Sequence, residues 1–314
     1  RSGARAGVHP PARAMNTARG VATALLRSPQ ALATAACGVG AAAALLGGIA
    51  WSSSLLDDAV LVVLAVTVVF VAYFQSDWAL PLVQRVQPEV VWRIPTSQNL
   101  AALTIDDVPL LQKPTAFEEI LDVLKEHQVT ATLFVMSGFR LPEAEGGMVP
   151  AASDRCLALL RRAVAEGHEL ANHVQFDYPS VAMPPEDFVR AFEHCDALLA
   201  ELAGGAEKWR GRPRRWFRPA SALWNGRILE VARARGYTTV ISNCYPHDVS
   251  AATRHINPTY LGWRARPGAV IVVHDRWHTP ATLARALPVI AARGLRLTTL
   301  SALQAAADAE RKAD

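Results

Sequence analysis

Acidic, histidine and arginine residues stand directly after several apolar runs in this 314-residue chain. Asp106 and Asp107 follow the run "LAALTI", His173 and His274 end two further runs, and Arg218 follows "RWF". Carboxylates and imidazoles transfer protons near neutral pH, and both bind divalent cations. Because several successive runs end in such complementary groups, we interpret them as one site.

Each of these residues would be a weak signal if it stood alone. An isolated His is more often hydrogen-bonded than a ligand, an Asp pair commonly caps a helix or turn, and an Arg commonly pairs with a surface carboxylate. The chain contains no GxGxxG or Walker sequence, so a nucleotide site is not predicted. The evidence for a site is that several successive apolar runs each end in such a residue.

Short apolar runs alternate with helical patterns from residue 98 onward. We expect strands at 100–105, 130–136, 168–173, 215–217, 237–242, 269–274 and 295–300. We expect helices at 116–127, 153–166, 185–203, 225–235 and 279–293. Strands regularly separated by helices predict parallel βα units, and the length of this part suits a small βα barrel. In such a barrel the functional groups gather at the C-terminal ends of the strands.

Four motifs resemble those of the NodB-type polysaccharide deacetylases, also called carbohydrate esterase family four. "TIDDVP" is similar to TFDDGP, "GHELANHVQFD" to GHExxNHTxxH, "RWFRPASALWN" to RxFRPPxGxxN, and "VIVVHD" to the terminal LLHD. Their order and spacing agree across residues 98–303, about two thirds of the chain. The resemblance implies an α/β fold, a distorted (β/α) barrel of the NodB-homology type, over 98–305, with a short tail at 306–314.

The resemblance also assigns roles to individual residues. It implies that Asp106 is the general base, that Arg218 holds Asp106 ionised and oriented, and that His274 is the general acid. Asp107 and His173 would be ligands of a divalent metal ion, Zn or else Co or Mn. The implied activity is metal-dependent hydrolysis of a non-peptide carbon-nitrogen bond, which removes acetyl groups from N-acetylated sugars of a chitin-like polysaccharide and releases acetate.

One ligand position departs from the family motif. The motif has a second His four residues after the first, and here that position is Asp177. Asp is a competent ligand, so the resemblance implies a set of Asp107, His173 and Asp177 with two negative charges instead of one. A harder, more anionic set should lower the Lewis acidity of the ion and tolerate Mn, Co or Mg as well as Zn. We therefore expect retained activity with a shifted metal preference.

Two further departures lie outside the ligands. Val108 and Ala220 stand where the family usually has Gly and Pro, which should reshape the substrate cleft. The Asp-Trp signature of the fourth motif is absent, so either Asp248 or Asp275 is expected to orient His274. A backbone N–H near Ala220 and the following serine is a candidate for oxyanion stabilisation.

Two alternative functions remain open. The chain could be a hydrolase of another non-peptide amide bond, as some relatives of these deacetylases are. It could instead be a glycan-binding protein whose catalytic site has decayed, as Asp177 would suggest. The joint presence of the two adjacent carboxylates, both histidines and the arginine argues against decay, because relaxed sites lose such residues independently.

The N-terminal part has a different composition. Residues 1–56 contain five arginines and no Asp or Glu, which is typical of a targeting or membrane-flanking arm and not of a nucleic-acid groove. We expect a basic arm at 1–30 and hydrophobic membrane segments within 31–76. The stretch 59–74 has no polar face and is the stronger candidate for a transmembrane helix, and 31–50 is a weaker second one.

The orientation of the catalytic domain depends on the number of spans. A single anchor at 59–74 with arginines before it places the domain on the lumenal or extracellular side, which we expect, whereas a second span at 31–50 would return it to the cytoplasmic side. A proline-containing linker is expected at 77–97. No protein partner is implied, and the expected partners are an N-acetylated glycan and the membrane. The four cysteines form no CxxC pair and are expected to be small buried residues.

Overall fold

The structure is a computed structural model, and it describes residues 80–111 and 115–313. The basic arm expected at 1–30 and the membrane segments expected within 31–76 lie outside these residues. In the described part of the chain, none of the helices combines the length and the apolar character that crossing a membrane requires.

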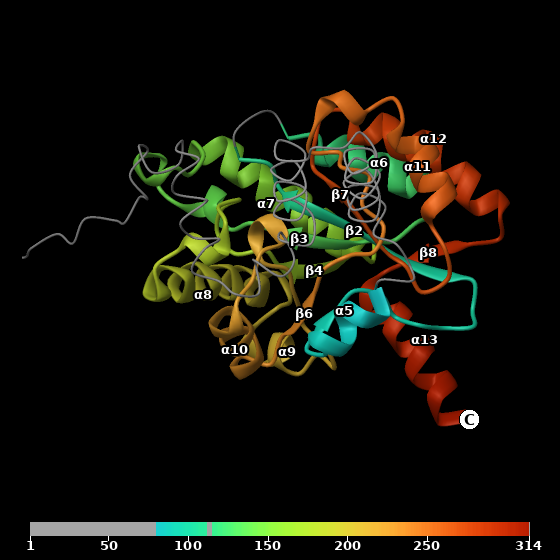
Figure 1. Cartoon of the computed structure of the whole chain (residues 1–314). Coiled ribbons are helices and arrows are strands. Elements are labelled where there is room, and N and C mark those ends of the chain that lie inside the picture. The colour runs from blue at the N-terminus through green and yellow to red at the C-terminus, as the bar shows by residue number, and fades with distance from the viewer. Residues whose placement is uncertain (1–79, 112–114, 314) are drawn as a thin grey trace, which may run out of the picture.

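Parallel strands form one curved sheet at the centre of the described residues (Figure 1). The strands are β1 (Val90–Val91), β2 (Leu100–Val108), β3 (Thr132–Val135), β4 (Glu169–Asn172), β5 (Trp216–Phe217), β6 (Thr238–Val240), β7 (Val270–His274) and β8 (Arg296–Thr298). Their order is β1-β6-β5-β4-β3-β2-β7, and β8 pairs with β2. Beyond β6, Cys244 forms a parallel bridge with Ile271 of β7, so the sheet curls toward a distorted barrel.

Helices follow most strands and cover the outside of the sheet. They are α5 (Leu80–Val86), α6 (Phe117–Glu126), α7 (Pro150–Ala165), α8 (Pro185–Leu202), α9 (Ala206–Arg210), α10 (Gly226–Ala234), α11 (Asn257–Arg264), α12 (Thr279–Ala292) and α13 (Leu300–Ala313). Short 3₁₀ turns lie at Gly138–Arg140, Glu143–Glu145, Ser180–Ala182, Ala220–Ala222 and Ala251–Thr253. The seven strands and five helices expected from the sequence pattern are all present, each with shifted ends.

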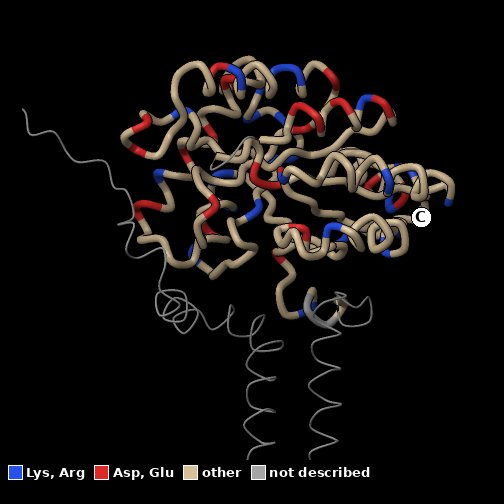
Figure 2. Tube along the Cα trace, turned by 90° about the horizontal axis from the view of Figure 1, so that it is seen from above, with Lys and Arg blue, Asp and Glu red and all other residues tan. Residues whose placement is uncertain are grey.

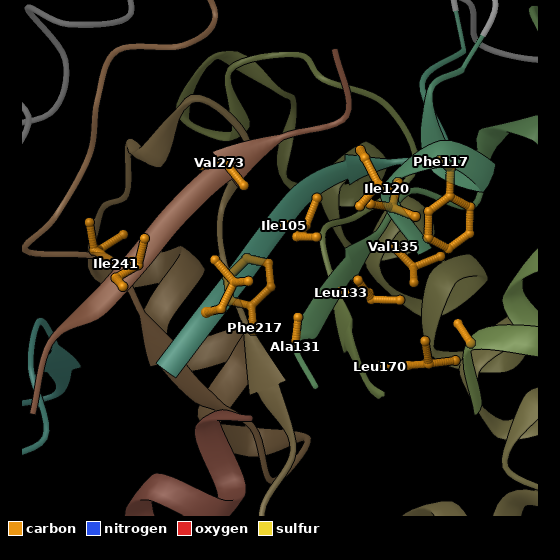
Figure 3. Close-up of a cluster of buried hydrophobic side chains, with 14 of the residues drawn as sticks. Ile105, Phe117, Ile120, Ala131, Leu133, Val135, Leu170, Phe217, Ile241 and Val273 are labelled. Atoms are coloured by element: carbon orange, nitrogen blue, oxygen red, sulfur yellow. The ribbon is translucent and has the colours of Figure 1, made fainter. Parts of the chain in front are cut away.

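The larger part of the core lies between the sheet and the outer helices. Side chains alternate between the two faces of a strand, and Ile105, Leu133 and Val135 point outward from β2 and β3. Phe117 and Ile120 of α6 belong to the same buried cluster (Figure 3). The apolar positions of α6 recur at helical spacing, and this explains why one stripe of the helix is buried against the strands.

A second buried cluster fills the inside of the curved sheet. Ala102 and Phe134 point inward, opposite to their neighbours along the strands, and Trp216 of β5 joins them. Leu300 and Leu303 of α13 complete the cluster. The N-terminus of α13 lies at the beginnings of β3 and β4, because the Leu300 N–H donates to Thr132 Oγ1 at 2.8 Å. The helix therefore closes the end of the barrel opposite to the strand C-termini.

Two sequence-based boundaries differ from the structure. Strand β1 and helix α5 lie in the range expected to be a linker, and β1 pairs with β6, so the sheet begins before residue 98. A two-residue strand is too short to show any periodicity in the sequence. The range 306–313 is part of α13 and not an irregular tail, and Ala307 is 1% exposed. Glu310 accepts hydrogen bonds from the Thr96 hydroxyl at 2.7 Å and from the Ser97 N–H at 3.0 Å.

Glycine is required at the turn before β7. Gly268 has φ +77°, and a Cβ at this position would lie 2.5 Å from the Ile94 carbonyl oxygen. Only glycine tolerates both the left-handed backbone and this close approach. Gly167, Gly236 and Gly294, which precede β4, β6 and β8, have the same left-handed conformation.

Lys, Arg, Asp and Glu are interspersed along the helices in Figure 2. Ion pairs connect α6 and α7, where Arg162 Nη2 lies 2.7 Å from Asp122 Oδ1 and Arg155 pairs with Glu118. Exposed pairs of this kind contribute little free energy of folding. The fold is therefore stabilised mainly by the two buried clusters.

Candidate active site

The C-terminal ends of neighbouring strands bring the sequence-predicted residues together. Asp106 of β2 lies directly beside His274 of β7 in the strand register. His173 follows β4, and Arg218 follows β5, whose Phe217 pairs with Asn172. Asp106, His173 and Arg218 are each at most 3% exposed. The expected convergence at the strand ends is confirmed, and the chemical roles assigned from the resemblance remain predictions.

Arg218 crosses the interior of the barrel and holds Asp106. Its Nη1 donates to Asp106 Oδ1 and to Thr104 Oγ1 at 2.5 and 2.8 Å. Its Nε and Nη2 donate to the carbonyl oxygens of Val240 and Ile241 at 3.2 and 2.7 Å. Burial lowers the pKa of Arg218, and Asp106 opposes that effect. A buried guanidinium with this many acceptors is fixed, so it also fixes the orientation of the carboxylate.

An irregularity in β2 turns Asp107 toward the same site. Adjacent residues in a regular strand point to opposite faces, but the register of β2 with β3 shifts between Ile105 and Val108. Asp107 has φ +61°, in the left-handed region. This bulge brings the second carboxylate to His173, whose Nε2 lies 3.3 Å from Asp107 Oδ1.

His173 is fixed by its other ring nitrogen. Nδ1 lies 2.8 Å from the Arg218 carbonyl oxygen, which can only accept, so Nδ1 carries the proton. Nε2 therefore faces the two carboxylates, at 3.9 Å from Asp106 Oδ2. Burial lowers the pKa of His173, but the charges of Asp106 and Asp107 outweigh it, and the net pKa is raised.

Asp248 orients His274, and Asp275 does not. Asp248 Oδ1 lies 2.8 Å from His274 Nδ1, and Oδ2 accepts the His274 backbone N–H at 2.7 Å. Burial would lower the pKa of His274, but the negative charge of Asp248 raises it to about 9. Asp275 instead accepts the backbone N–H groups of Leu110 and Ala116, each at 2.8 Å. This settles the two alternatives left by the sequence.

Two of the three expected metal ligands, Asp107 and His173, are adjacent, and the charge of Asp107 acts on the third, Asp177. Asp177 is exposed, and its pKa is raised by desolvation and by the negative charge of Asp107. Within 80–111 and 115–313, no three His, Cys, Asp or Glu side chains are grouped closely enough to hold a metal ion. The donor types suit a divalent cation, but their arrangement in this structure does not fit one.

Arg276 is a residue of the site that the sequence patterns did not reveal. Its Nη2 donates to Asp107 Oδ2 at 2.6 Å, so both oxygens of Asp107 have a partner. Burial would raise the pKa of Asp107, but the hydrogen bond from His173 and the charges of His274 and Arg276 lower it well below its usual value. The only signal in the sequence was the position of Arg276, two residues after His274.

Left-handed backbone conformations recur around the site. Besides Asp107, they occur at Val174 (φ 61°), Ser221 (φ 60°) and His247 (φ 57°), each of which lies in a segment that follows a strand. For a β-branched residue such as Val174 this conformation is unfavourable, and such strain clusters at functional sites. The backbone therefore supports the location of the site independently of the side chains.

One of the candidate oxyanion donors, the backbone N–H of Ala220, is already paired. The Ala220 N–H donates to Ser180 Oγ at 3.0 Å, so it is already satisfied within the loop. Tyr245, which sequence reasoning did not single out, lies beside the site, with its ring 5.6 Å from that of His274. Burial and the charge of Asp248 raise the pKa of Tyr245, so its hydroxyl stays protonated.

A curved parallel sheet with an ion-paired carboxylate and a carboxylate-bound imidazole at its strand ends defines a βα-barrel protein whose strand ends carry groups suited to proton transfer. Residues 93–240 match the family model described as "Polysaccharide deacetylase". The match covers just under half of the chain, and the NodB-type resemblance of its motifs is confirmed.

Several deacetylases resemble this chain in sequence. A peptidoglycan-N-acetylglucosamine deacetylase of Bacillus cereus is 28% identical over 224 residues, which cover 68% of this chain and 92% of that protein. A chitooligosaccharide deacetylase of Sinorhizobium fredii is 28% identical over 212 residues, which cover 63% of this chain and 88% of that protein. The family of these relatives implies a hydrolase of carbon-nitrogen bonds.

Solved structures share the fold. One is the crystal structure of a pseudoenzyme of carbohydrate esterase family four from Bacillus anthracis, with a TM-score of 0.53 and 17% identity. The match covers 68% of this chain and 68% of that one. Since a pseudoenzyme has this architecture, catalysis depends on the site residues and not on the fold alone.

Proposed function

We propose that this protein hydrolyses the acetamide of N-acetylated sugars in a chitin-like polysaccharide and releases acetate. The observation that carries the proposal is the pair of fixed proton-transfer groups, Asp106 held by Arg218 and His274 held by Asp248. They come from adjacent positions of β2 and β7, so both face one substrate position. The names of the deacetylase relatives support the substrate class.

The two groups have complementary roles in the proposed reaction. Asp106 accepts a proton from water as the water oxygen bonds to the acetyl carbon. The carbon-nitrogen bond then breaks, and His274 gives its proton to the nitrogen, which is too basic to leave as an anion. Because the pKa of His274 is raised to about 9, the ring is protonated at neutral pH and can serve as the acid. The products are acetate and the free amino sugar.

The proposal includes a divalent cation, Zn or else Co or Mn, with Asp107, His173 and Asp177 as its ligands. The residue types support it, whereas in the described residues the three side chains are not grouped closely enough to hold an ion. A bound cation would polarise the acetamide carbonyl. Asp106 and His274, which are assigned the proton transfers, are not among the three proposed ligands of the cation.

Acetate release tests the proposal. The full chain, loaded separately with Zn, Co or Mn, would be incubated with N-acetylated chitooligosaccharides, because β1 and Trp92 belong to the core and a domain cut at residue 95 would lose them. We expect acetate with at least one cation. Asp106→Asn, which keeps the shape but not the base, should abolish release and retain cation binding. Asp154→Asn, on the exposed face of α7, is the matched control.

A glycan-binding protein without catalysis is the second candidate. The contact between Arg276 and Asp107 favours this second candidate. The guanidinium pairs with an oxygen of Asp107, a carboxylate that a metal-dependent enzyme would use to bind its cation. If folded, cation-loaded protein releases no acetate but binds the oligosaccharides, this reading replaces the first. If the chain releases an amine from a non-sugar amide and none from glycans, it is a hydrolase of another amide bond.

We further propose that the hydrophobic segments within 31–76 anchor the protein in a membrane, with the catalytic domain on the lumenal or extracellular side. The apolar composition of 59–74 and the arginines before it support this orientation. Protease protection of the domain in sealed vesicles would test it. Digestion only after the vesicles are opened identifies a lumenal domain in membranes of known sidedness.

A further inference from the structure

Arg276 begins from an anchored stretch of backbone. It follows Asp275, whose carboxylate accepts the N–H groups of Leu110 and Ala116 and the hydroxyl of Thr115. The Asp275 N–H in turn donates to the Asp106 carbonyl oxygen at 2.9 Å. These bonds tie the segment after β7 to the segment after β2, so the base of the Arg276 side chain has a defined position next to Asp107.

The guanidinium of Arg276 folds back over the site. Nη1 donates to the Asp275 carbonyl oxygen at 2.9 Å, and Nη2 donates to Asp107 Oδ2 at 2.6 Å. The Arg276 side chain is 15% exposed, and the Asp107 side chain is 2% exposed. A charge-assisted hydrogen bond that is largely shielded from water is much stronger than a surface ion pair. This contact is therefore a substantial competitor for the Asp107 oxygen.

The charges of the site explain why a cation is needed there. Asp106 faces Arg218, and Asp248 faces His274, so these two carboxylates have their own partners. Asp107 forms ion pairs with His173 and Arg276. Asp177 adds a negative charge where the family motif has a neutral imidazole, and the negative charges of Asp107 and Asp177 both act on Arg276. The guanidinium supplies the positive charge that this more acidic group lacks.

We propose that Arg276 is the resident counter-cation of Asp107 and competes with a divalent metal ion for that carboxylate, so that the metal binds only when Arg276 releases Oδ2. A guanidinium and a divalent ion on one carboxylate repel each other. The inference concerns regulation of the site proposed above. Its effect on activity rests on the proposed function, because the fraction of protein with bound metal would then limit the rate. Its test measures binding and requires no activity.

Metal affinity of the full chain tests the inference. The protein would first be freed of metal by chelation, and the Kd for Mn²⁺ and for Zn²⁺ would be measured by titration calorimetry in wild type, Arg276→Met and Arg276→Gln. Both variants keep an extended side chain and lose the charge. We expect the Kd of both variants to be lower than that of wild type by roughly tenfold or more. This is the change that removal of one competing charged hydrogen bond should cause. Arg276→Lys keeps a positive charge and should stay close to wild type.

A matched control removes a distant arginine. Arg296 of β8 is exposed and lies at the N-terminal end of β2, so Arg296→Met should leave the Kd unchanged. Metal-free Arg276→Met should also melt at a lower temperature than wild type and recover more stability when Mn²⁺ is added, since Asp107 Oδ2 then lacks a partner until the ion binds.

The inference would be overturned if both Arg276→Met and Arg276→Gln bound metal no more tightly than wild type. Circular dichroism would first show that both variants are folded. The outcome is separate from that of the proposed function. Tighter binding without acetate release would reject the deacetylase proposal and support the competition. Acetate release with an unchanged Kd would support the deacetylase proposal and reject the competition.

Discussion

Asp248 holds His274 through both of its carboxylate oxygens. Oδ1 lies 2.8 Å from the ring Nδ1, and Oδ2 accepts the backbone N–H of the same residue at 2.7 Å. The ring is thereby fixed in position, with Nε2 directed away from Asp248. The negative charge opposes the effect of burial and raises the pKa of His274 to about 9.

The first prediction concerns the alkaline limb of activity. If protonated His274 is the acid, kcat/KM should fall as the pH rises through about 9. Asp248→Asn removes the negative charge and retains an oxygen for the His274 N–H, so the limb should move to lower pH. The pH profiles of wild type and variant with a chitooligosaccharide provide the measurement. Identical alkaline limbs would contradict the role of Asp248.

The same shift has a consequence for stability. The pKa of His274 is higher in the folded state than the ordinary value of about 6.5, so its contribution to the free energy of unfolding is fully present below about pH 6.5. That contribution is lost as the pH rises through about 9. Wild type should therefore lose more stability than Asp248→Asn between pH 6 and pH 10, measured by thermal melting.

The second prediction concerns Arg218. Arg218→Met should lower the free energy of unfolding by about 3–5 kcal/mol, because it leaves the buried Asp106 carboxylate without its cation. Denaturant unfolding measures the change. Arg155→Met removes an arginine whose pair with Glu118 is exposed, and it should leave stability unchanged. Equal effects of the two substitutions would show that the interior position of Arg218 does not matter.

The third prediction concerns Asp177. If Asp177 is a ligand, Asp177→Ala should weaken divalent metal binding by roughly tenfold or more, and Asp177→His should favour Zn over Mn because imidazole is the softer ligand. Metal content after dialysis and the Kd of each ion are the readouts. Asp154→Ala on α7 is the control. If Asp177→Ala changed neither metal content nor turnover, the ligand role would be wrong.

The fourth prediction concerns Trp277, which is 67% exposed three residues after His274. Its ring packs edge-on against that of His278, with the centroids 5.2 Å apart, so the indole is supported. A supported, exposed aromatic ring beside the site can bury the apolar face of a sugar. Trp277→Ala should raise KM about fivefold or more for longer chitooligosaccharides, with kcat little changed. Trp277→Phe should recover most of the affinity, and an unchanged KM in the alanine variant would reject a contact with the glycan.

Much of the fold was predictable because its signals are local. Alternation of apolar runs with helical patterns identified the strands from β2 to β8 and the five longer helices between them. Strand β1 and helices α5, α9 and α11 were missed, because they have two to eight residues and show no usable period. Residues 306–313 were expected to be a tail and belong to helix α13 instead, since the contacts of this helix with Thr96 and Ser97 are made by tertiary packing.

The sequence by itself determined which residues have the types that could carry chemistry and that they follow strands, since residue type and periodicity are local properties. Tertiary structure decided how they are paired. Regular alternation would place Asp106 and Asp107 on opposite faces, and only the bulge in β2 turns both toward His173. The choice of Asp248 over Asp275, and the contact of Arg276 with Asp107, depend on segments far apart in the chain. Such contacts follow from how the barrel closes, which no local pattern specifies.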